Sequence, residues 1–336
     1  MKVCVIGNGG REHALAWRLS ISPSVTKVYA IPGSAAMSDC AELVGIDWQQ
    51  SDHLISFLKD NHVDLVVVGP EAPLVAGLAD ALNAAGIPVF GPSKAAAQLE
   101  GSKVFAKDVM KKYNIPTAAY GVFHKVDEAK EFIAQTGAPI VVKADGLAAG
   151  KGVVVAMTIE EANAAVEDML SGNRFGEAGS TVVIEEFMEG EEASLLAFVD
   201  GKTVIPMIAS QDHKRIFDGD KGPNTGGMGT YAPAPVLTDA LRDEAMKTIL
   251  EPMVAAMEKE GMPYVGCLYA GLMITSQGPK VVEFNARFGD PETQVVLPLL
   301  DSDLGQIMMA CATGTLTADM VKWKDSSAAC VILASK

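Results

Sequence analysis

The chain has 336 residues, of which 49% are hydrophobic, and a net charge of −15 at pH 7. The length predicts two or three domains with a sizeable core, and the acidic balance excludes a protein that binds nucleic acid through a broadly cationic surface. No apolar run approaches the ~20 residues of a membrane span, and the N-terminal apolar run is too short for a signal peptide. The five cysteines are odd in number and far apart, which predicts reduced thiols in a cytoplasmic protein.

Apolar runs alternate with helical patterns through the first hundred residues. They predict strands at 2–6, 25–31, 65–68 and 87–90 and helices at 11–19, 54–61 and 74–85. This alternation predicts a doubly wound parallel sheet. Ligands bind at the carboxyl ends of such strands, where loops rich in glycine or proline stand at 7–10, 32–34, 69–73 and 91–93.

The pattern changes after residue 102 to an α+β region with mostly antiparallel strands. Helices are predicted at 103–113, 129–136, 159–170 and 238–260, the last with a break at Pro252. Strands are predicted at 139–143, 153–157, 181–187, 193–199 and 202–210, and from 326 onward. Residues 268–275 and 280–284 form a predicted hairpin around Gln277-Gly278.

The first motif is Gly7-Asn8-Gly9-Gly10, which follows a predicted strand and precedes a helix. It is not a nicotinamide site, because Glu12 takes the third glycine position and Ala30-Ile31-Pro32 offers no acidic residue to read a ribose. Amides at a helix N-terminus can still hold a phosphate. A simple tight turn is the alternative.

The second motif is the glycine-rich segment 143–152, between two predicted strands. It is not a Walker A loop, because its glycine spacing is wrong and a strand follows it. A flap of this kind can fold over a triphosphate, with Lys143 and Lys151 offsetting its charge. The alternative is a hairpin with solvated lysines.

The acidic segment 185–192 contains two carboxylates followed by two apolar residues at the end of a strand. Backbone groups at such a position suit the edge of a purine. An acidic cluster is more often a solvated face, so this signal is weak alone.

The segment 283–287 places Glu283, Asn285 and Arg287 on one face of a predicted strand, because side chains alternate with period two. A carboxylate and an amide oxygen two residues apart suit a hard cation such as Mg²⁺ that also binds substrate phosphates. Arg287 beside them can hold a carboxylate. A polar surface stripe is the alternative.

The segments 210–215 and 222–229 combine charges of both signs with a glycine-rich loop, as a polyanionic substrate would require. His213 is either a structural histidine or a substrate contact. The sequence shows no Ser-His-Asp or Cys-His nucleophile pattern.

Taken together, these segments resemble the ATP-grasp superfamily and, more closely, the phosphoribosylamine–glycine ligase family. The blocks that carry the resemblance span the chain, at 5–14, 68–74, 142–152, 211–215, 222–229 and 283–293. The resemblance implies an α/β fold: an N-terminal doubly wound parallel sheet (pre-ATP-grasp) followed by an α+β ATP-grasp domain. It implies a substrate-binding domain at 1–102, a small subdomain with the flap at 103–190, a catalytic subdomain at 191–325 and the start of a further domain at 326–336.

The resemblance also implies an activity. The family joins glycine to 5-phosphoribosylamine in purine biosynthesis, consuming ATP and passing through glycyl phosphate. Such chemistry depends on positioning and charge neutralisation rather than on a protein nucleophile. We therefore expect a cytoplasmic, monomeric ligase that uses ATP with Mg²⁺ or Mn²⁺ and has neither nucleic-acid nor membrane partners.

Site residues follow from the resemblance by motif. ATP is expected at Lys103, Lys143, Lys151, Gly152, the hinge residues Glu185, Glu186, Phe187 and Met188, and Glu192 at the ribose. The metal ligands are expected to be Glu283 and Asn285. The catalytic candidates are Arg287 and Asp212, for the carboxylate and amine of glycine, together with Lys143. The substrates are expected near Gly9, Gly10, Glu71, Asp212, His213, Lys214, Gly226, Arg287, Asp290, Pro291 and Glu292. Of these, Gly9, Gly10, Glu71, His213, Lys214 and Asp290 to Glu292 are expected to surround phosphoribosylamine.

Two alternatives stay open at this point. One is another ATP-grasp carboxylate–amine ligase that uses a different acid. The other is an inactive nucleotide-binding form, because the family carries a further small C-terminal domain and this chain ends at Lys336. We accordingly expect that domain to be missing.

Overall fold

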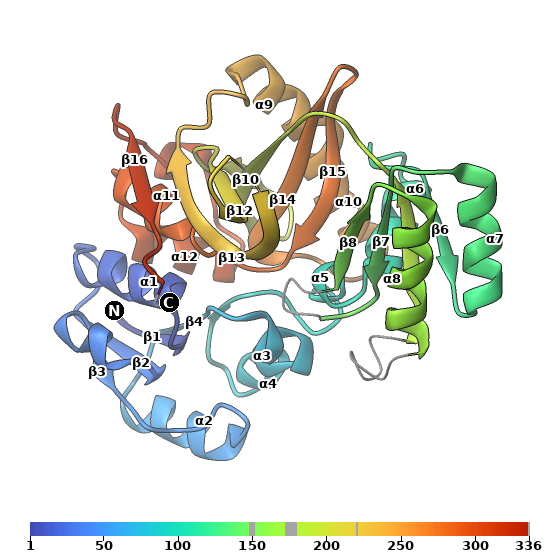
Figure 1. The fold of residues 1–336 in the computed structure, drawn as a ribbon. Coiled ribbons are helices and arrows are strands. Elements are labelled where there is room, and N and C mark those ends of the chain that lie inside the picture. Colours follow the sequence, from blue (N-terminus) through green and yellow to red (C-terminus); the bar gives the residue numbers. More distant parts are fainter. Residues whose placement is uncertain (148–151, 172–179, 220, 335–336) are drawn as a thin grey trace.

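The computed structural model describes residues 1–147, 152–171, 180–219 and 221–334 (Figure 1). A parallel sheet with its helices forms the N-terminal part, and three antiparallel sheets form the rest. No helix in these described ranges is long and apolar enough to cross a membrane.

The N-terminal sheet has five parallel strands in the order β3-β2-β1-β4-β5. They are β1 (Lys2–Gly7), β2 (Lys27–Pro32), β3 (Glu42–Leu43), β4 (Leu65–Val68) and β5 (Val89–Phe90). The predicted doubly wound sheet is thus confirmed; the two-residue strand β3 was not predicted.

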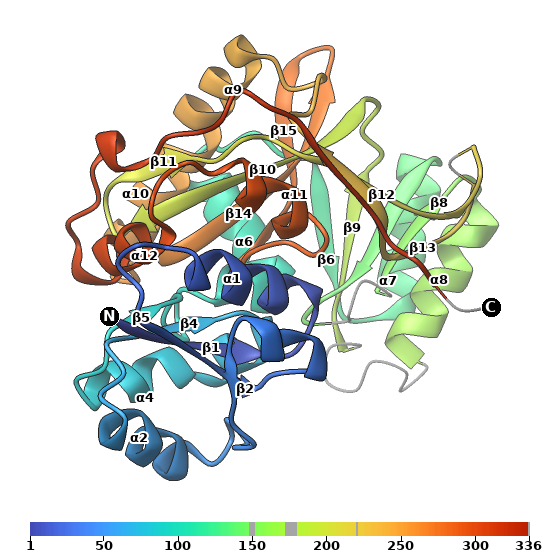
Figure 2. The same cartoon turned by 90° about the vertical axis from the view of Figure 1, so that its left-hand side faces the viewer.

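Helices cover both faces of this sheet (Figure 2): α1 (Gly10–Ser20) on one face, and α2 (Ser51–Asp60) and α4 (Leu78–Ala84) on the other. Alternate side chains of β1 point to opposite faces of the sheet. Val3 and Val5 pack in the core that contains α1, whereas Cys4 and Ile6 pack in the core that contains α2 and α4. Burial on both faces explains why the strands read as continuous apolar runs.

The helix α3 (Glu71–Ala76) and the 3₁₀ turn η1 (Ala35–Asp39) complete the N-terminal region. The helix predicted at 74–85 is divided into α3 and α4, because Gly77 between them takes a left-handed conformation with φ +96°. The turn η1 follows β2.

A small antiparallel sheet follows, in the order β6-β9-β7-β8. Its strands are β6 (Tyr120–Phe123), β9 (Val182–Glu186), β7 (Ile140–Ala144) and β8 (Val153–Ala156). The helices α7 (Val126–Thr136) and α8 (Ile159–Ser171) pack on it in a core of their own. The helices α5 (Gln98–Gly101) and α6 (Lys103–Lys112) connect the N-terminal sheet to this unit.

The larger antiparallel sheet has the order β11-β10-β14-β15. Its strands are β10 (Glu191–Asp200), β11 (Val204–Pro206), β14 (Val265–Thr275) and β15 (Gly278–Asn285), with β14 and β15 forming the predicted hairpin. Its two faces pack against α10 (Glu251–Lys259) on one side and against α11 (Thr293–Leu299) and α12 (Leu304–Thr313) on the other. The strand predicted at 202–210 is shorter than expected: within it only β11 forms a continuous strand beside β10, and Ser210 adds an isolated bridge to Ser194.

The helix predicted at 238–260 does not break at Pro252. It runs from α9 (Asp239–Ala245) through a π-helical turn, η3 (Met246–Leu250), into α10. Proline has no N–H to donate to the preceding turn, and the wider turn just before Pro252 lets the helix continue.

A third antiparallel sheet joins β12 (Gln211–Phe217), β13 (Lys221–Ala232) and β16 (Ala328–Val331). The strand predicted from residue 326 therefore pairs with β13, and a 3₁₀ turn, η4 (Ala318–Met320), precedes it. The domain bounds stay a prediction.

The loop before α1 is built around the side chain of Glu12, the residue that breaks the dinucleotide pattern. Its Oε2 accepts a hydrogen bond from the Gly9 N–H at 2.7 Å, and its Oε1 accepts one from Arg11 Nε at 2.5 Å. A Cβ on Gly69, in the loop after β4, would lie 2.2 Å from Glu12 Oε1. Glu12 is thus an internal cap that needs glycine beside it.

We predict that Gly69→Ala destabilises the fold by about 1–3 kcal/mol, because the added methyl must displace the hydrogen-bonded Glu12 carboxylate. Urea unfolding measures the change. Gly45→Ala is the control, because Gly45 is exposed and no atom lies within 4 Å of the position that an added Cβ would take. Equal stability of the two variants would contradict this account of the loop.

Candidate active site

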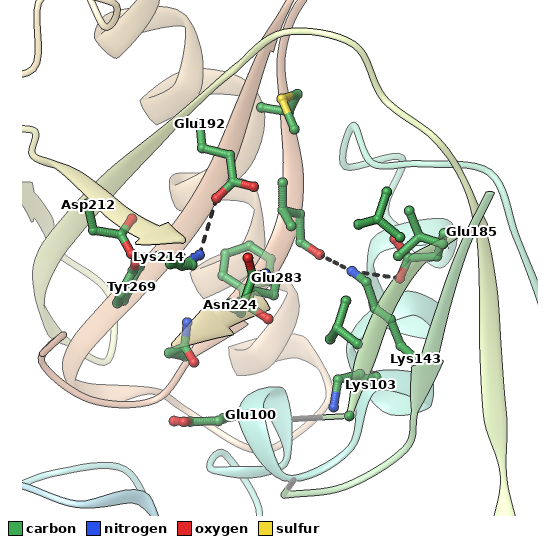
Figure 3. A pocket seen from close by; sticks show the side chains of 18 of the residues that line it. Glu100, Lys103, Lys143, Glu185, Glu192, Asp212, Lys214, Asn224, Tyr269 and Glu283 are labelled. Atoms are coloured by element: carbon green, nitrogen blue, oxygen red, sulfur yellow. Dashed lines mark hydrogen bonds and ion pairs between the residues drawn. The ribbon is translucent and has the colours of Figure 1, made fainter. Parts of the chain in front are cut away.

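A cavity of about 980 Å³ lies between the small sheet and the larger antiparallel sheet. Helix α6 and strands β7 and β9 form one wall, and β12, β14 and β15 form the opposite wall (Figure 3). Glu71 reaches it from the start of α3, which follows β4 of the N-terminal sheet. The N-terminal region and all three antiparallel sheets therefore contribute residues to one cavity.

Among the described residues, six lysine and arginine side chains line this cavity, including three lysines from different elements. Lys103 on α6 donates to the Gly146 carbonyl at 2.9 Å, and Lys143 on β7 donates to the Val282 carbonyl at 2.9 Å. Lys214 comes from β12, and Arg287 follows β15. Burial lowers the pKa of Lys103 from its usual value. Such a set of positive charges suits a polyphosphate.

Glu283 and Asn285 occupy alternate positions at the end of β15 and both line the cavity. Burial acts to raise the pKa of Glu283, but the positive charges of Lys214, Lys143 and Lys103 outweigh it and leave the pKa below its usual value. The carboxylate is therefore ionised, and its oxygen suits a hard divalent cation. No group of three His, Cys, Asp or Glu side chains within the described ranges forms a complete metal site.

Arg287 is held by two carboxylates. Its Nη2 lies 2.9 Å from Glu100 Oε1, and its Nε lies 3.3 Å from Glu71 Oε2. Burial raises the pKa of Glu100, whereas at Glu71 the effect of burial is outweighed by the charge of Arg287, so that its pKa is lowered. Arg287 thus already has anionic partners in the place where it is expected to hold a substrate carboxylate.

Lys214 lies between two acidic side chains on the β12 side of the cavity. Its Nζ is 3.2 Å from Glu192 Oε2 and 3.8 Å from Asp212 Oδ2, and Figure 3 shows all three facing the cavity. Burial raises the pKa of Asp212 to about 6, with Lys214 opposing the shift. Nearby, the Tyr269 hydroxyl donates to Glu292 Oε1 at 2.6 Å.

The hinge segment holds an ion cluster where a nucleotide contact is expected. Glu185 Oε1 lies 3.1 Å from Lys143 Nζ, and Glu185 Oε2 lies 3.1 Å from Lys107 Nζ. The next residues of the segment, Glu186 to Met188, line the cavity.

The loop before α1 lies at the border of the cavity. Asp290, which lines it, accepts a hydrogen bond from the Arg11 N–H at 3.3 Å, and the Gly9 N–H is bonded to Glu12. The Gly9 amide, which belongs to the loop predicted to hold a phosphate, and the neighbouring Arg11 amide are therefore already hydrogen-bonded to carboxylates.

The cavity brings together most of the predicted site residues. Those that line it are Glu71, Lys103, Lys143, Gly152, Glu185, Glu186, Phe187, Met188, Glu192, Asp212, His213, Lys214, Gly226, Glu283, Asn285, Arg287, Asp290 and Glu292. Gly9, Gly10 and Pro291 do not line it, and Lys151 lies outside the described residues. The functional roles of all these residues stay predictions.

Sequence reasoning missed Glu100, Lys107 and Tyr269, which also line the cavity. Lys107 had a readable signal, because it lies four residues after Lys103 and therefore on the same face of a predicted helix. Glu100 and Tyr269 stand outside every motif, and only the tertiary structure places them at the site.

Family models match nearly the whole chain. The model described as the N domain of phosphoribosylglycinamide synthetase matches residues 1–100, and that of its ATP-grasp (A) domain matches residues 101–293. Two curated proteins named phosphoribosylamine–glycine ligase, from Agrobacterium fabrum and Vibrio cholerae, are 56% and 53% identical to the chain. Each alignment covers 100% of this chain and 79% of the relative.

Solved structures agree with this. The crystal structure of phosphoribosylamine–glycine ligase from Thermotoga maritima matches with a TM-score of 0.86 and 33% identity, covering 100% of this chain and 81% of that one. The biotin carboxylase domain of the Hydrogenobacter thermophilus 2-oxoglutarate carboxylase, solved with MgADP and bicarbonate, matches with a TM-score of 0.74 at 18% identity, over 98% of this chain and 73% of that one. This second likeness concerns the fold alone.

Asp212 gives a prediction about pH. Its pKa is about 6 in the fold against ~3.9 in an unfolded chain, so the folded chain binds more protons between these values. Its contribution to stability is therefore largest at low pH and is lost as the pH rises through 6. Asp212→Asn, which stays neutral, should raise the free energy of unfolding at pH 7.5 by about 3 kcal/mol, and this gain should shrink below pH 5.

Urea unfolding of both proteins at pH 5 and 7.5 measures the effect. Asp319→Asn, at an exposed position, is the control. A gain that is the same at both pH values would show that Asp212 does not titrate as described.

Proposed function

Because the chain belongs to the phosphoribosylglycinamide synthetase family, we propose that it joins glycine to 5-phosphoribosylamine at the expense of ATP. The products are glycinamide ribonucleotide, ADP and phosphate. The observation that carries this proposal is the single cavity that combines Lys103, Lys143 and Lys214 with an ionised Glu283. We also propose that the ligase acts as a cytoplasmic monomer, and its five free thiols support the location.

The reaction takes place in two steps. A carboxylate oxygen of glycine attacks the γ-phosphorus of ATP, the bond to the β-phosphate oxygen breaks, and glycyl phosphate and ADP result. The amine of phosphoribosylamine then attacks the glycyl carbonyl carbon, phosphate leaves, and the amine loses a proton. The protein supplies alignment and positive charge rather than a nucleophile.

The lysines of the cavity neutralise the triphosphate. Lys103 and Lys143 lie on the wall formed by α6 and β7, and the hinge residues Glu186 to Met188 lie on the same wall, so we assign the nucleotide to this side. Lys143 is 4% exposed, and in such a poorly solvated place a positive charge acts more strongly on a phosphate than it would in water.

Glu283 and Asn285 fit a divalent cation, because they supply two oxygen donors on one face of β15 and the carboxylate is ionised. We propose Mg²⁺ or Mn²⁺ as the ion. When bound, it would neutralise phosphate oxygens of ATP, which complete its ligand set together with water.

The acceptor side of the cavity carries the remaining assignments. We propose Asp212 for the ammonium group of glycine and Arg287 for its carboxylate, which requires Arg287 to exchange Glu71 or Glu100 for the substrate. Phosphoribosylamine is assigned to the neighbourhood of His213, Lys214 and Asp290, toward the loop before α1.

The test is an ADP-release assay with phosphoribosylamine generated in the reaction mixture. We expect ADP formation that requires both glycine and phosphoribosylamine, and formation of glycinamide ribonucleotide in equal amount. Greater activity with another amino acid would favour a different carboxylate–amine ligase. Tight ATP binding without turnover would favour a nucleotide-binding form.

We predict that Glu283→Gln lowers kcat/KM by about 100-fold, because an amide oxygen carries no net charge for the cation. Steady-state rates over a Mg²⁺ titration measure the change. Glu258→Gln is the control, because Glu258 is exposed on α10 and contacts Lys202. Unchanged rates at limiting Mg²⁺ would remove Glu283 from the site.

A further inference from the structure

Lys107 is a buried cation that the mechanism above does not use. It lies on α6, one helical turn after Lys103, and its side chain is 3% exposed. Its Nζ donates to Thr117 Oγ1 at 2.8 Å and lies 3.1 Å from Glu185 Oε2. Burying a charged lysine costs free energy unless an opposite charge pairs with it. We therefore asked what the buried position of Lys107 contributes to the site.

The partner of Lys107 is shared with a proposed ATP ligand. Glu185 offers its other oxygen, Oε1, to Lys143 Nζ at 3.1 Å, and Figure 3 shows the two side chains pointing toward each other. The pairing of β7 with β9 causes this, because Val141 stands opposite Glu185 and Lys143 is two residues further on the same face. One carboxylate thus lies between two ammonium groups.

The sharing affects what Lys143 can offer a phosphate. If Glu185 faced Lys143 alone, its full negative charge would offset that lysine and compete with the nucleotide. With Lys107 on its second oxygen, the cluster of Lys107, Glu185 and Lys143 keeps a net charge of +1, and Lys143 is held without being neutralised.

A second contact ties the cluster to the strand that carries Glu283. Thr117 Oγ1, which accepts the hydrogen bond from Lys107, donates to the Val281 carbonyl at 2.7 Å. The next carbonyl on β15, that of Val282, accepts from Lys143. Lys107 therefore lies where the segments holding the lysine and the proposed metal ligand come together.

We propose that Lys107 is a positioning residue for ATP, which acts by occupying one oxygen of Glu185 so that Lys143 is aligned and keeps its charge for the triphosphate. The inference rests on the proposed function, since it takes ATP as the ligand. Burial lowers the pKa of Lys107 to about 8, which leaves it mostly protonated at neutral pH, as this role requires.

The experiment measures MgATP affinity by calorimetry in the absence of glycine and phosphoribosylamine. We expect Lys107→Met to weaken affinity about tenfold, the lower range for removing a group that orients a ligating side chain, while kcat at saturating ATP changes less. Lys112→Met is the matched control: it lies on the same helix and also pairs with a glutamate, Glu260, at 2.6 Å, but far more exposed. It should bind ATP as the unaltered chain does.

Two further variants separate positioning from other roles. In a Glu185→Gln background, Lys107→Met should have no further effect, and an additive loss would mean that Lys107 contacts ATP directly, which overturns the proposal. Lys107→Gln keeps a donor for Thr117 without the charge and should weaken affinity as Met does. Unaltered affinity in the Gln variant would show that only the hydrogen bond matters, and would also overturn it.

Thermal unfolding accompanies each measurement, and Lys107→Gln serves as the test if the Met variant does not fold. Failure of this inference and failure of the proposed function give different results. A chain that binds ATP but forms no glycinamide ribonucleotide overturns the proposed ligase activity, whereas loss of the coupling between Lys107 and Glu185 overturns only this inference.

Discussion

Lys143 and Arg287 lie in poorly solvated parts of one cavity, with side chains 4% and 18% exposed, and Lys214 lines the same cavity. Two like charges 4 Å apart repel by about 4 kcal/mol even at an effective dielectric constant of 20. Carboxylates placed beside these cations make this arrangement possible. Glu185 pairs with Lys143, Glu192 with Lys214, and Glu100 with Arg287. The rest of the site depends on this balance, since each of these carboxylates comes from a different segment of the chain.

The same balance prepares the cavity for anionic ligands. A carboxylate that pairs with a cation in the free protein holds it in place at low energetic cost, and an incoming phosphate or carboxylate has to compete for it. Arg287 illustrates this, because Glu71 and Glu100 already occupy it. Lys143 is the opposite case. Glu185 pairs with Lys143 through one carboxylate oxygen and with Lys107 through the other, so part of the positive charge of Lys143 stays available to a ligand.

Strand β15 is the structural centre of the site. Side chains alternate along it, which brings Glu283 and Asn285 to one face, and its carbonyl groups at Val281 and Val282 accept hydrogen bonds from Thr117 and Lys143. The small sheet, the larger sheet and the connecting segment 116–118 are therefore fixed to each other through this strand. Such fixing suits a reaction that depends on alignment rather than on a protein nucleophile.

The sequence by itself determined the parallel N-terminal sheet, the β14–β15 hairpin and the grouping of Glu283 with Asn285, because periodicity and glycine spacing are local properties. It also pointed to Lys103, Lys143 and Lys214 through their motifs. Only the tertiary structure decided the partners of these residues. Glu100 and Glu185 meet Arg287 and Lys143 across 187 and 42 positions of the chain, and no local pattern records which buried carboxylate will balance which cation.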